Sequence, residues 1–187
     1  NVCFVRDLPD GGFEILVDDS ALSYSIHTGG VFFVDDWAYF NAQGADGTDD
    51  ALRRLHLESG AIEAVLELDQ GWVDHFTKGP DGRLYWVRGD DVLDTYTLES
   101  HDPLANETTA LANPSDWVSD VRVTSGHVVW ADLNGLYDYA LDTGAIRTHA
   151  GAGTIHFSLD DDRLWFTRND ADLMGAGLMT DLGCIAL

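Results

Sequence analysis

The chain has 187 residues, with 33 acidic and 10 basic side chains, and its net charge of −23 argues against binding to nucleic acid or anionic membranes. Hydrophobic residues make up 45% of the sequence, which is enough to bury a core and excludes a disordered chain. No apolar run approaches the roughly 18 residues that a membrane-spanning helix needs, so we expect no membrane insertion.

Residues 1–29 are the least regular part of the sequence, and two alignments of this segment are open. In the first, "PDGG" (9–12) matches "PDGR" (80–83) as a hairpin turn, and residues 1–29 form a unit without its outermost strand. In the second, "VRDLPDGGFEIL" (5–16) is the last hairpin of a truncated unit. Both alignments predict a partial unit before residue 30.

The rest of the chain repeats one pattern about every forty residues. Each repeat contains a strand with a tight turn, a strand with a central aromatic residue, a strand that ends in a polar turn, and a last short strand. The repeated aromatic residues are Phe40, Trp86, Trp130 and Phe166. Apolar residues alternate in these segments, which is typical of β-strands, and even "DDALRRLHLESG" (49–60) aligns with a strand that enters a turn. The four units are 30–69, 70–113, 114–151 and 152–187.

Four short strands per repeat predict the blades of a β-propeller. One small sheet cannot bury both of its faces, whereas sheets stacked around an axis bury the aromatic faces between neighbours. We therefore predict an all-β fold, a single β-propeller domain over residues 1–187, with four whole four-stranded blades and a partial N-terminal blade. A five-bladed ring and a fragment of a larger ring both fit this count. The aromatic pairs, Trp165–Phe166 among them, are expected to fill the gaps between blades.

Three motifs carry a resemblance to a known superfamily. They are "YWVR" (85–88), "VWAD" (129–132) and "WFTR" (165–168), and "GLYDYALDTG" (135–144) follows the second. With these motifs the chain resembles the TolB-like and YWTD-type six-bladed β-propellers. The resemblance implies the fold and leaves the activity open, because propellers serve binding, scaffolding and enzymatic roles.

Motifs of known catalytic sites are missing from the sequence. It has no GxSxG nucleophile elbow, no HExxH, no P-loop, no GxGxxG after a strand and no Cys/His zinc spacing. The acidic segment "GADGTDD" (44–50) does not match the calcium loop of an EF-hand, and a plain polar turn is the alternative to a weak metal site at Asp46, Asp49 and Asp50. Calcium or another divalent metal is therefore the only cofactor that the sequence suggests.

His75, Arg122 and His156 fall at matching places on the first strand of three successive units. Because the innermost strands of a propeller line its central channel, these residues are expected to form part of a ring around the axis. Two imidazoles and a guanidinium, with Asp74 and Asp120 beside them, could bind a metal or a carboxylate ligand. The alternative is that they fill or solvate the channel wall.

Trp72 and Trp117 lie in "GWVDH" (71–75) and "DWVSD" (116–120), where one blade crosses to the next. Such crossing loops gather on one rim of a propeller, where an aromatic side chain could bind a sugar or a peptide. The alternative is that both rings are wedges between blades.

Three short features support weaker predictions. Arg88-Gly89-Asp90 matches a tripeptide that integrins recognise in other proteins, but here it is expected simply to end a strand. Cys3 and Cys184 are either joined by a disulfide, which would suit a secreted, periplasmic or cell-surface protein, or are two unrelated thiols. The excess of Asp favours a fold rich in turns, and adaptation to a salty habitat is the alternative.

Three functions follow as hypotheses. The first is a non-catalytic binding or assembly module that uses rim loops or an open blade edge, with a protein partner or a second copy covering an incomplete ring. The second is a propeller enzyme, a lyase or hydrolase with a histidine-centred channel site. The third is an acidic subunit of a surface layer or filament. The missing catalytic motifs favour the first.

Overall fold

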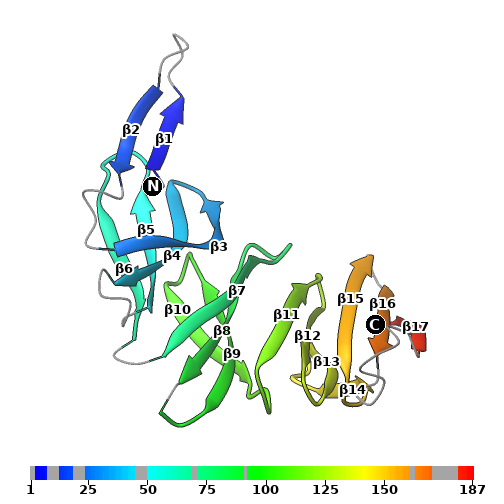
Figure 1. The fold of residues 1–187 in the computed structure, drawn as a ribbon. Coiled ribbons are helices and arrows are strands. Elements are labelled where there is room, and N and C mark those ends of the chain that lie inside the picture. The colour runs from blue at the N-terminus through cyan, green and yellow to red at the C-terminus, as the bar shows by residue number, and fades with distance from the viewer. Residues whose placement is uncertain are drawn as a thin grey trace. The chain divides into compact units, whose positions relative to one another are not determined.

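The computed structural model (Figure 1) describes residues 3–7, 13–18, 24–44, 50–68, 71–90, 92–160, 163–169 and 181–187. Every regular element in these ranges is a β-strand, so the all-β prediction is confirmed. The described part of the chain contains no helix of the length and hydropathy that crossing a membrane requires. The chain forms two compact units, Asn1–Phe76 with Arg88–Asp94, and Thr77–Val87 with Thr95–Leu187.

The strands form antiparallel sheets in which neighbours along the chain are neighbours in the sheet. A two-stranded sheet contains β1 (Cys3–Asp7) and β2 (Phe13–Asp18). The next sheet contains β3 (Tyr24–Val34), β4 (Trp37–Gly44), β5 (Asp50–His56) and β6 (Ile62–Glu67). It is followed by β7 (Trp72–Lys78), β8 (Leu84–Asp90), β9 (Thr95–Asp102) and β10 (Glu107–Ala112).

Two further sheets complete the described chain. One contains β11 (Val118–Val123), β12 (His127–Asp132), β13 (Gly135–Ala140) and β14 (Ile146–Ala150). The other contains β15 (Thr154–Asp160), β16 (Arg163–Asn169) and β17 (Asp181–Ala186). The four repeated aromatic residues all lie on the second strand of their sheets, as predicted, and Arg88-Gly89-Asp90 ends β8.

The N-terminal pairing decides between the two alignments of residues 1–29. Strands β1 and β2 pair with each other through Cys3–Asp18 and Asp7–Phe13. Tyr24 pairs instead with Gly44 of β4, so the segment that begins there belongs to the following sheet. The first alignment, which placed this segment in the N-terminal unit, is therefore wrong, and the pairing agrees with the second alignment.

The last sheet corrects a second strand assignment. The repeat pattern places a fourth, short strand at the end of unit 152–187, but Cys184 pairs with Trp165 and Ile185 with Leu164. These residues therefore belong to β17, which is the third strand of the sheet. Cys184 is an exposed free thiol, whereas the side chain of Cys3 lies outside the described residues.

Aspartate side chains close several turns, which explains part of the Asp excess. Asp90 Oδ1 accepts hydrogen bonds from the backbone N–H groups of Val92 and Leu93, both at 2.9 Å. Asp102 Oδ1 accepts in the same way from Leu104 and Ala105 at 3.0 and 3.1 Å. A short carboxylate that bonds the backbone two or three residues ahead is the reason that Asp favours turns.

In the second unit the sheets β11–β14 and β15–β17 share one apolar cluster. Val129, Ala131 and Leu136 are fully buried there together with Leu164, and Phe166 packs against them. Side chains alternate along a strand, so Val129 and Ala131 lie on one face of β12, which is the face that meets the next sheet. The prediction of aromatic residues between sheets is thus confirmed for Phe166, but Trp165 lies on the opposite face and is 39% exposed.

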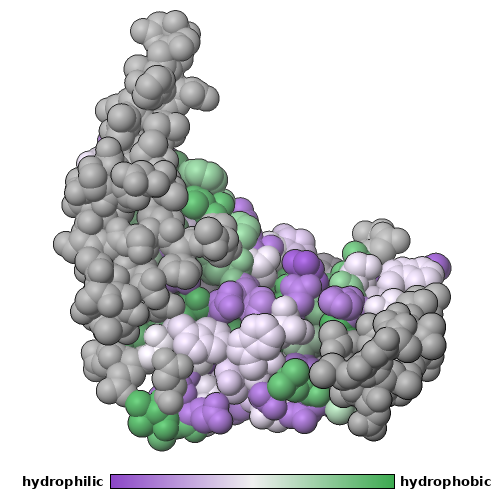
Figure 2. Space-filling model, viewed as in Figure 1, coloured by the Kyte–Doolittle hydropathy of each residue, from purple (hydrophilic) through white to green (hydrophobic). Residues whose placement is uncertain are grey.

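In the first unit the core of β3–β6 contains Ala38, Phe40, Ala42 and Leu55. The amide of Asn41 donates a hydrogen bond to the carbonyl of Val73 at 2.7 Å and so joins β4 to β7. Figure 2 shows hydrophilic residues over much of the described surface in that view, with apolar residues in separate groups. Scattered apolar groups are normal for a protein surface, so an interaction site has to be argued from specific side chains.

Candidate ligand-binding cavity

A cavity of about 460 Å³ lies beside β11 and β15 in the second unit. It brings together three residues that the sequence suggested for ligand binding, Trp117, Arg122 and His156, with Asp120, which the sequence placed beside Arg122, and it adds Asp132 to them. Its size lies within the range of about 300–1,000 Å³ that is usual for small-molecule sites. We therefore take this cavity as the candidate functional site.

The strand register places Arg122 and His156 differently from the prediction. Val121 pairs with Trp130, and Arg122 is the residue after Val121. Phe157 pairs with Phe166, and His156 is the residue before Phe157. Since Trp130 and Phe166 are equivalent in the repeat, Arg122 and His156 lie two positions apart and not at matching places. A shift of two positions keeps each side chain on the equivalent face of its own sheet. Both residues line the one cavity.

The charged groups of the cavity are partly paired. Arg122 Nη2 lies 3.1 Å from Asp120 Oδ2, and both side chains retain contact with solvent. An ion pair of this kind contributes about 0–1 kcal/mol to stability. A guanidinium carries five N–H donors, so Arg122 and Asp120 together present both donors and an acceptor to a ligand.

Asp132 borders the cavity but has a structural role. Its Oδ1 accepts hydrogen bonds from the backbone N–H groups of Asn134 and Gly135 at 2.8 and 3.0 Å. Its Oδ2 accepts from the backbone N–H and the hydroxyl of Ser115, both at 3.3 Å. Oδ1 of this buried carboxylate therefore holds the turn between β12 and β13, and Oδ2 joins that turn to Ser115, which precedes β11.

The two tryptophans suggested by the sequence have different surroundings. Trp117 is 46% exposed and lines the cavity, so it is placed where an aromatic ring can contact a ligand. Trp72 packs over Gly89 of β8, where a Cβ atom would come within 2.3 Å of the indole. Trp72 is therefore held within its own sheet and packs as a structural ring.

His75 belongs to the first compact unit and is not among the residues that line this cavity. Its backbone is in the left-handed region with φ 52°, and its N–H donates to Asp74 Oδ1 at 2.7 Å. The predicted ring of His75 with Arg122 and His156 stays a prediction.

The predicted metal site falls largely outside the described residues. Asp46 and Asp49 lie in the segment 45–49, and Asp50 begins β5 with a side chain that is also outside the description. Among the described residues no group of three His, Cys, Asp or Glu side chains could hold a metal ion.

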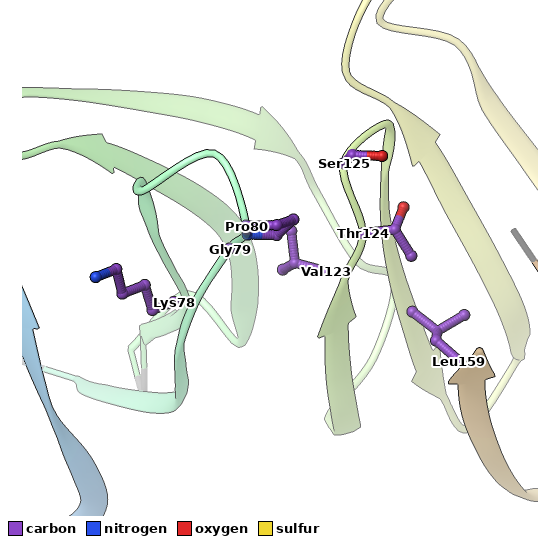
Figure 3. Close-up of a pocket in the computed structure, with 7 residues that line it drawn as sticks. All are labelled: Lys78, Gly79, Pro80, Val123, Thr124, Ser125 and Leu159. Carbon is purple, nitrogen blue, oxygen red and sulfur yellow. The ribbon is translucent and has the colours of Figure 1, made fainter. Parts of the chain in front are cut away.

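A second, larger cavity of about 740 Å³ is lined by fewer charged and aromatic side chains that could contact a ligand (Figure 3). It lies between the β7–β8 turn, the β11–β12 turn and β15, and the ammonium group of Lys78 points away from the other labelled residues. The hydroxyl of Thr124 accepts hydrogen bonds from the backbone N–H groups of Gly126 and His127, at 3.3 and 3.0 Å, so it serves the turn. Size alone therefore does not make this cavity the better candidate.

Sequence reasoning missed one polar cluster in the core of β11–β14. The fully buried carboxylate of Asp138 on β13 lies between His127 on β12 and His149 on β14. Each is eleven residues from the next, on a strand of its own, so the register of three adjacent strands was needed to reveal the cluster.

Comparison with known proteins shows the fold. No protein-family model matches the chain, and no curated protein matches its sequence. The β-propeller domain of the Trilobed protease from Pyrococcus furiosus is similar in structure, with a TM-score of 0.63 and 7% identity over 89% of this chain and 57% of that chain.

Two other propellers match the resemblance seen in the sequence. TolB from Acinetobacter baumannii has a TM-score of 0.52 and 13% identity over 89% of this chain and 45% of that chain. The Nidogen/Laminin complex contains a chain with a TM-score of 0.51 and 15% identity over 83% of this chain and 60% of that chain. The chain thus has a β-propeller fold like that of TolB and spans less than two thirds of each of these three chains.

Proposed function

We propose that the chain is a non-catalytic binding module and that the cavity at Trp117 takes a neutral saccharide. The observation that supports this is the presence of a half-exposed indole, a guanidinium, a carboxylate and an imidazole in one cavity of suitable size. This proposal keeps the rim-loop binding expected from the sequence and gives it a ligand class.

The side chains of the cavity match the two kinds of surface on a sugar ring. The indole of Trp117 offers a flat apolar face for the C–H groups of the ring. Arg122 donates hydrogen bonds, Asp120 accepts them, and a neutral imidazole at His156 does either, so hydroxyl groups find partners of both kinds.

Charge favours a neutral ligand over the carboxylate ligand that the sequence left open. Arg122 already lies against Asp120, and the chain as a whole carries a charge of −23. A field of this sign slows the approach of anions. A carboxylate ligand therefore becomes a comparison arm of the test.

The test is an array of immobilised neutral oligosaccharides, with uronate-containing oligosaccharides and short peptides as comparison sets. We expect the wild-type chain to bind neutral oligosaccharides, Trp117→Ala to lose this binding at least tenfold, and Trp165→Ala to retain it. Trp165 is the matched control because it is an exposed indole of the same unit outside the cavity. Absence of binding, or equal loss in both variants, would overturn the proposal.

A catalytic role is the second candidate, because an imidazole and a carboxylate in one cavity can serve as acid and base. One of the similar structures is the propeller domain of a protease. If the site is a lyase or hydrolase, a bound oligosaccharide is cleaved, and His156→Ala abolishes cleavage while His75→Ala does not. Binding without cleavage would leave the binding module as the function.

A protein partner and a location outside the cytoplasm belong to the same proposal. One similar structure is a chain of the Nidogen/Laminin complex, in which a propeller occurs together with another protein. Secretion, periplasmic location or display at the cell surface would bring the cavity into contact with extracellular glycans. Fractionation of the native host with an antibody to the chain tests this location.

A further inference from the structure

The candidate cavity has an apolar part that the hydroxyl groups of a sugar do not use. Ile155 belongs to the apolar cluster shared by β11–β14 and β15–β17, Phe157 packs against that cluster, and both side chains line the cavity. Leu133 lines the cavity as well and is 57% exposed. These three side chains are named here the apolar wall. An apolar substituent on a ligand would be buried against this wall, and its removal from water favours binding.

The turn that carries Leu133 does not need a leucine. Leu133 is the first residue between β12 and β13, and turns of this kind are usually built from Gly, Asn, Asp, Pro or Ser. Asp132 Oδ1 accepts the two backbone hydrogen bonds that hold this turn, so the leucine side chain is not required for it. Because Val118 pairs with Asp132, Trp117 and Leu133 lie at the same end of β11 and β12. An exposed indole and an exposed leucine therefore border the cavity together.

A hydrogen-bond donor and an acceptor lie close to the apolar wall. Arg122 Nη2 lies 3.1 Å from Asp120 Oδ2. Asp120 pairs with Ala131, which precedes Leu133 by two residues, a span of at most about 7 Å along the chain. An acetamido group carries an N–H donor, a carbonyl acceptor and a methyl group, and it has no charge. The carboxylate, the guanidinium and the leucine of the cavity match these three parts.

We propose that the saccharide bound in this cavity is an N-acetylhexosamine and that Leu133 determines this specificity, an inference that rests on the proposed function because it concerns the same cavity. The N–H of the acetamido group donates to Asp120, its carbonyl accepts from Arg122, and its methyl group packs against the apolar wall. A hydroxyl group at the same place forms hydrogen bonds but buries no methyl group, so a sugar without the acetamido group binds more weakly.

Isothermal titration calorimetry with two pairs of neutral sugars tests the proposal. The pairs are chitotriose with cellotriose and N-acetylgalactosamine with galactose, and the members of a pair differ only in acetamido groups that replace hydroxyl groups. We expect the wild type to bind the N-acetylated member of at least one pair about tenfold more tightly than its partner. In Leu133→Ala this ratio of affinities is expected to fall to about threefold or less, with the affinity for the partner sugar unchanged within about twofold.

Leu104→Ala is the matched control. Leu104 is a leucine of the same unit, 84% exposed, in the turn between β9 and β10, and it does not line the cavity. Its turn is also held by an aspartate carboxylate, that of Asp102. We expect Leu104→Ala to keep the wild-type ratio of affinities.

The possible failures of this inference and of the proposed function give different results. Equal affinity for both members of each pair, or binding of other neutral oligosaccharides on the array but of no N-acetylated sugar, overturns the inference alone. A ratio that Leu133→Ala leaves unchanged, or that falls equally in Leu104→Ala, overturns it as well. If the wild type binds no neutral saccharide at all, the proposed function is wrong and the inference is wrong with it.

Discussion

His149 Nε2 lies 2.5 Å from Asp138 Oδ1, and the carboxylate of Asp138 is fully buried. The other oxygen of Asp138 lies 2.7 Å from His127 Nδ1. An ionised carboxylate only accepts hydrogen bonds, so both imidazoles donate to it. One side chain therefore ties β12, β13 and β14 together in the interior of their sheet.

Asp138→Ala is expected to lower the free energy of unfolding by about 3–5 kcal/mol, because it leaves two partly buried ring N–H groups without their acceptor. The matched control is Asp142→Ala, which removes an exposed carboxylate from the β13–β14 turn. We expect this control to change stability by no more than about 0.5 kcal/mol. Denaturant unfolding followed by circular dichroism measures both values, and similar small losses would show that Asp138 does not hold the sheet.

Gly89→Ala is expected to destabilise the chain by about 1–3 kcal/mol, because a Cβ at this position meets Trp72 Cε2 at 2.3 Å. Gly126→Ala is the control, since a Cβ there meets nothing within 4 Å. Thermal unfolding compares the two variants. Combining Gly89→Ala with Trp72→Val relieves the clash, so a double variant that recovers no stability would contradict the packing of Trp72 on Gly89.

Tyr85 is expected to make stability depend on pH in the alkaline range. Burial, and after it the hydrogen bond from its hydroxyl to Asp81 Oδ2 at 2.7 Å, raises the pKa of Tyr85 well above its usual value. Above a pH of about 10 the unfolded chain releases this proton while the folded chain keeps it, so stability falls as the pH rises.

The comparison of wild type with Tyr85→Phe isolates this effect. The wild type is expected to be more stable by about 1 kcal/mol at pH 8, from the hydrogen bond to Asp81. This advantage shrinks above pH 10, as measured by urea unfolding at a series of pH values. An advantage that stays constant to the highest pH at which the chain folds would contradict the role given to Tyr85.

The sequence was sufficient to predict the strands and their grouping, because alternation and turn residues are local signals. It was not sufficient to assign Tyr24 or Cys184 to a strand partner, since similar motifs compete for the same pairing. The register of Arg122 against His156 failed for a related reason. Val123 lies seven residues before Trp130, whereas Phe157 lies nine residues before Phe166, so a gap-free alignment of the two hairpins misplaces the pairing by two positions.

Features that depend on contacts between strands or sheets were the hardest to predict. Trp165 and Phe166 are adjacent in the sequence, yet one is exposed and the other packs in the core, because the neighbouring sheet covers only one face. The different roles of Trp72 and Trp117 follow in the same way from a glycine on the adjacent strand. The candidate cavity was predicted in part, as four of its residues, Trp117, Asp120, Arg122 and His156, were named from the sequence.

The central claim is that β11–β14 and β15–β17 pack face to face and so form the cavity at Trp117. Methyl-labelled protein allows a direct measurement of nuclear Overhauser effects across this contact. We predict cross-peaks from the methyl groups of Val129 and Ala131 to those of Ile155 and Leu164, which share their apolar cluster. Cross-peaks from Val129 to Leu136 of its own sheet, without any to Ile155 or Leu164, would contradict the claim.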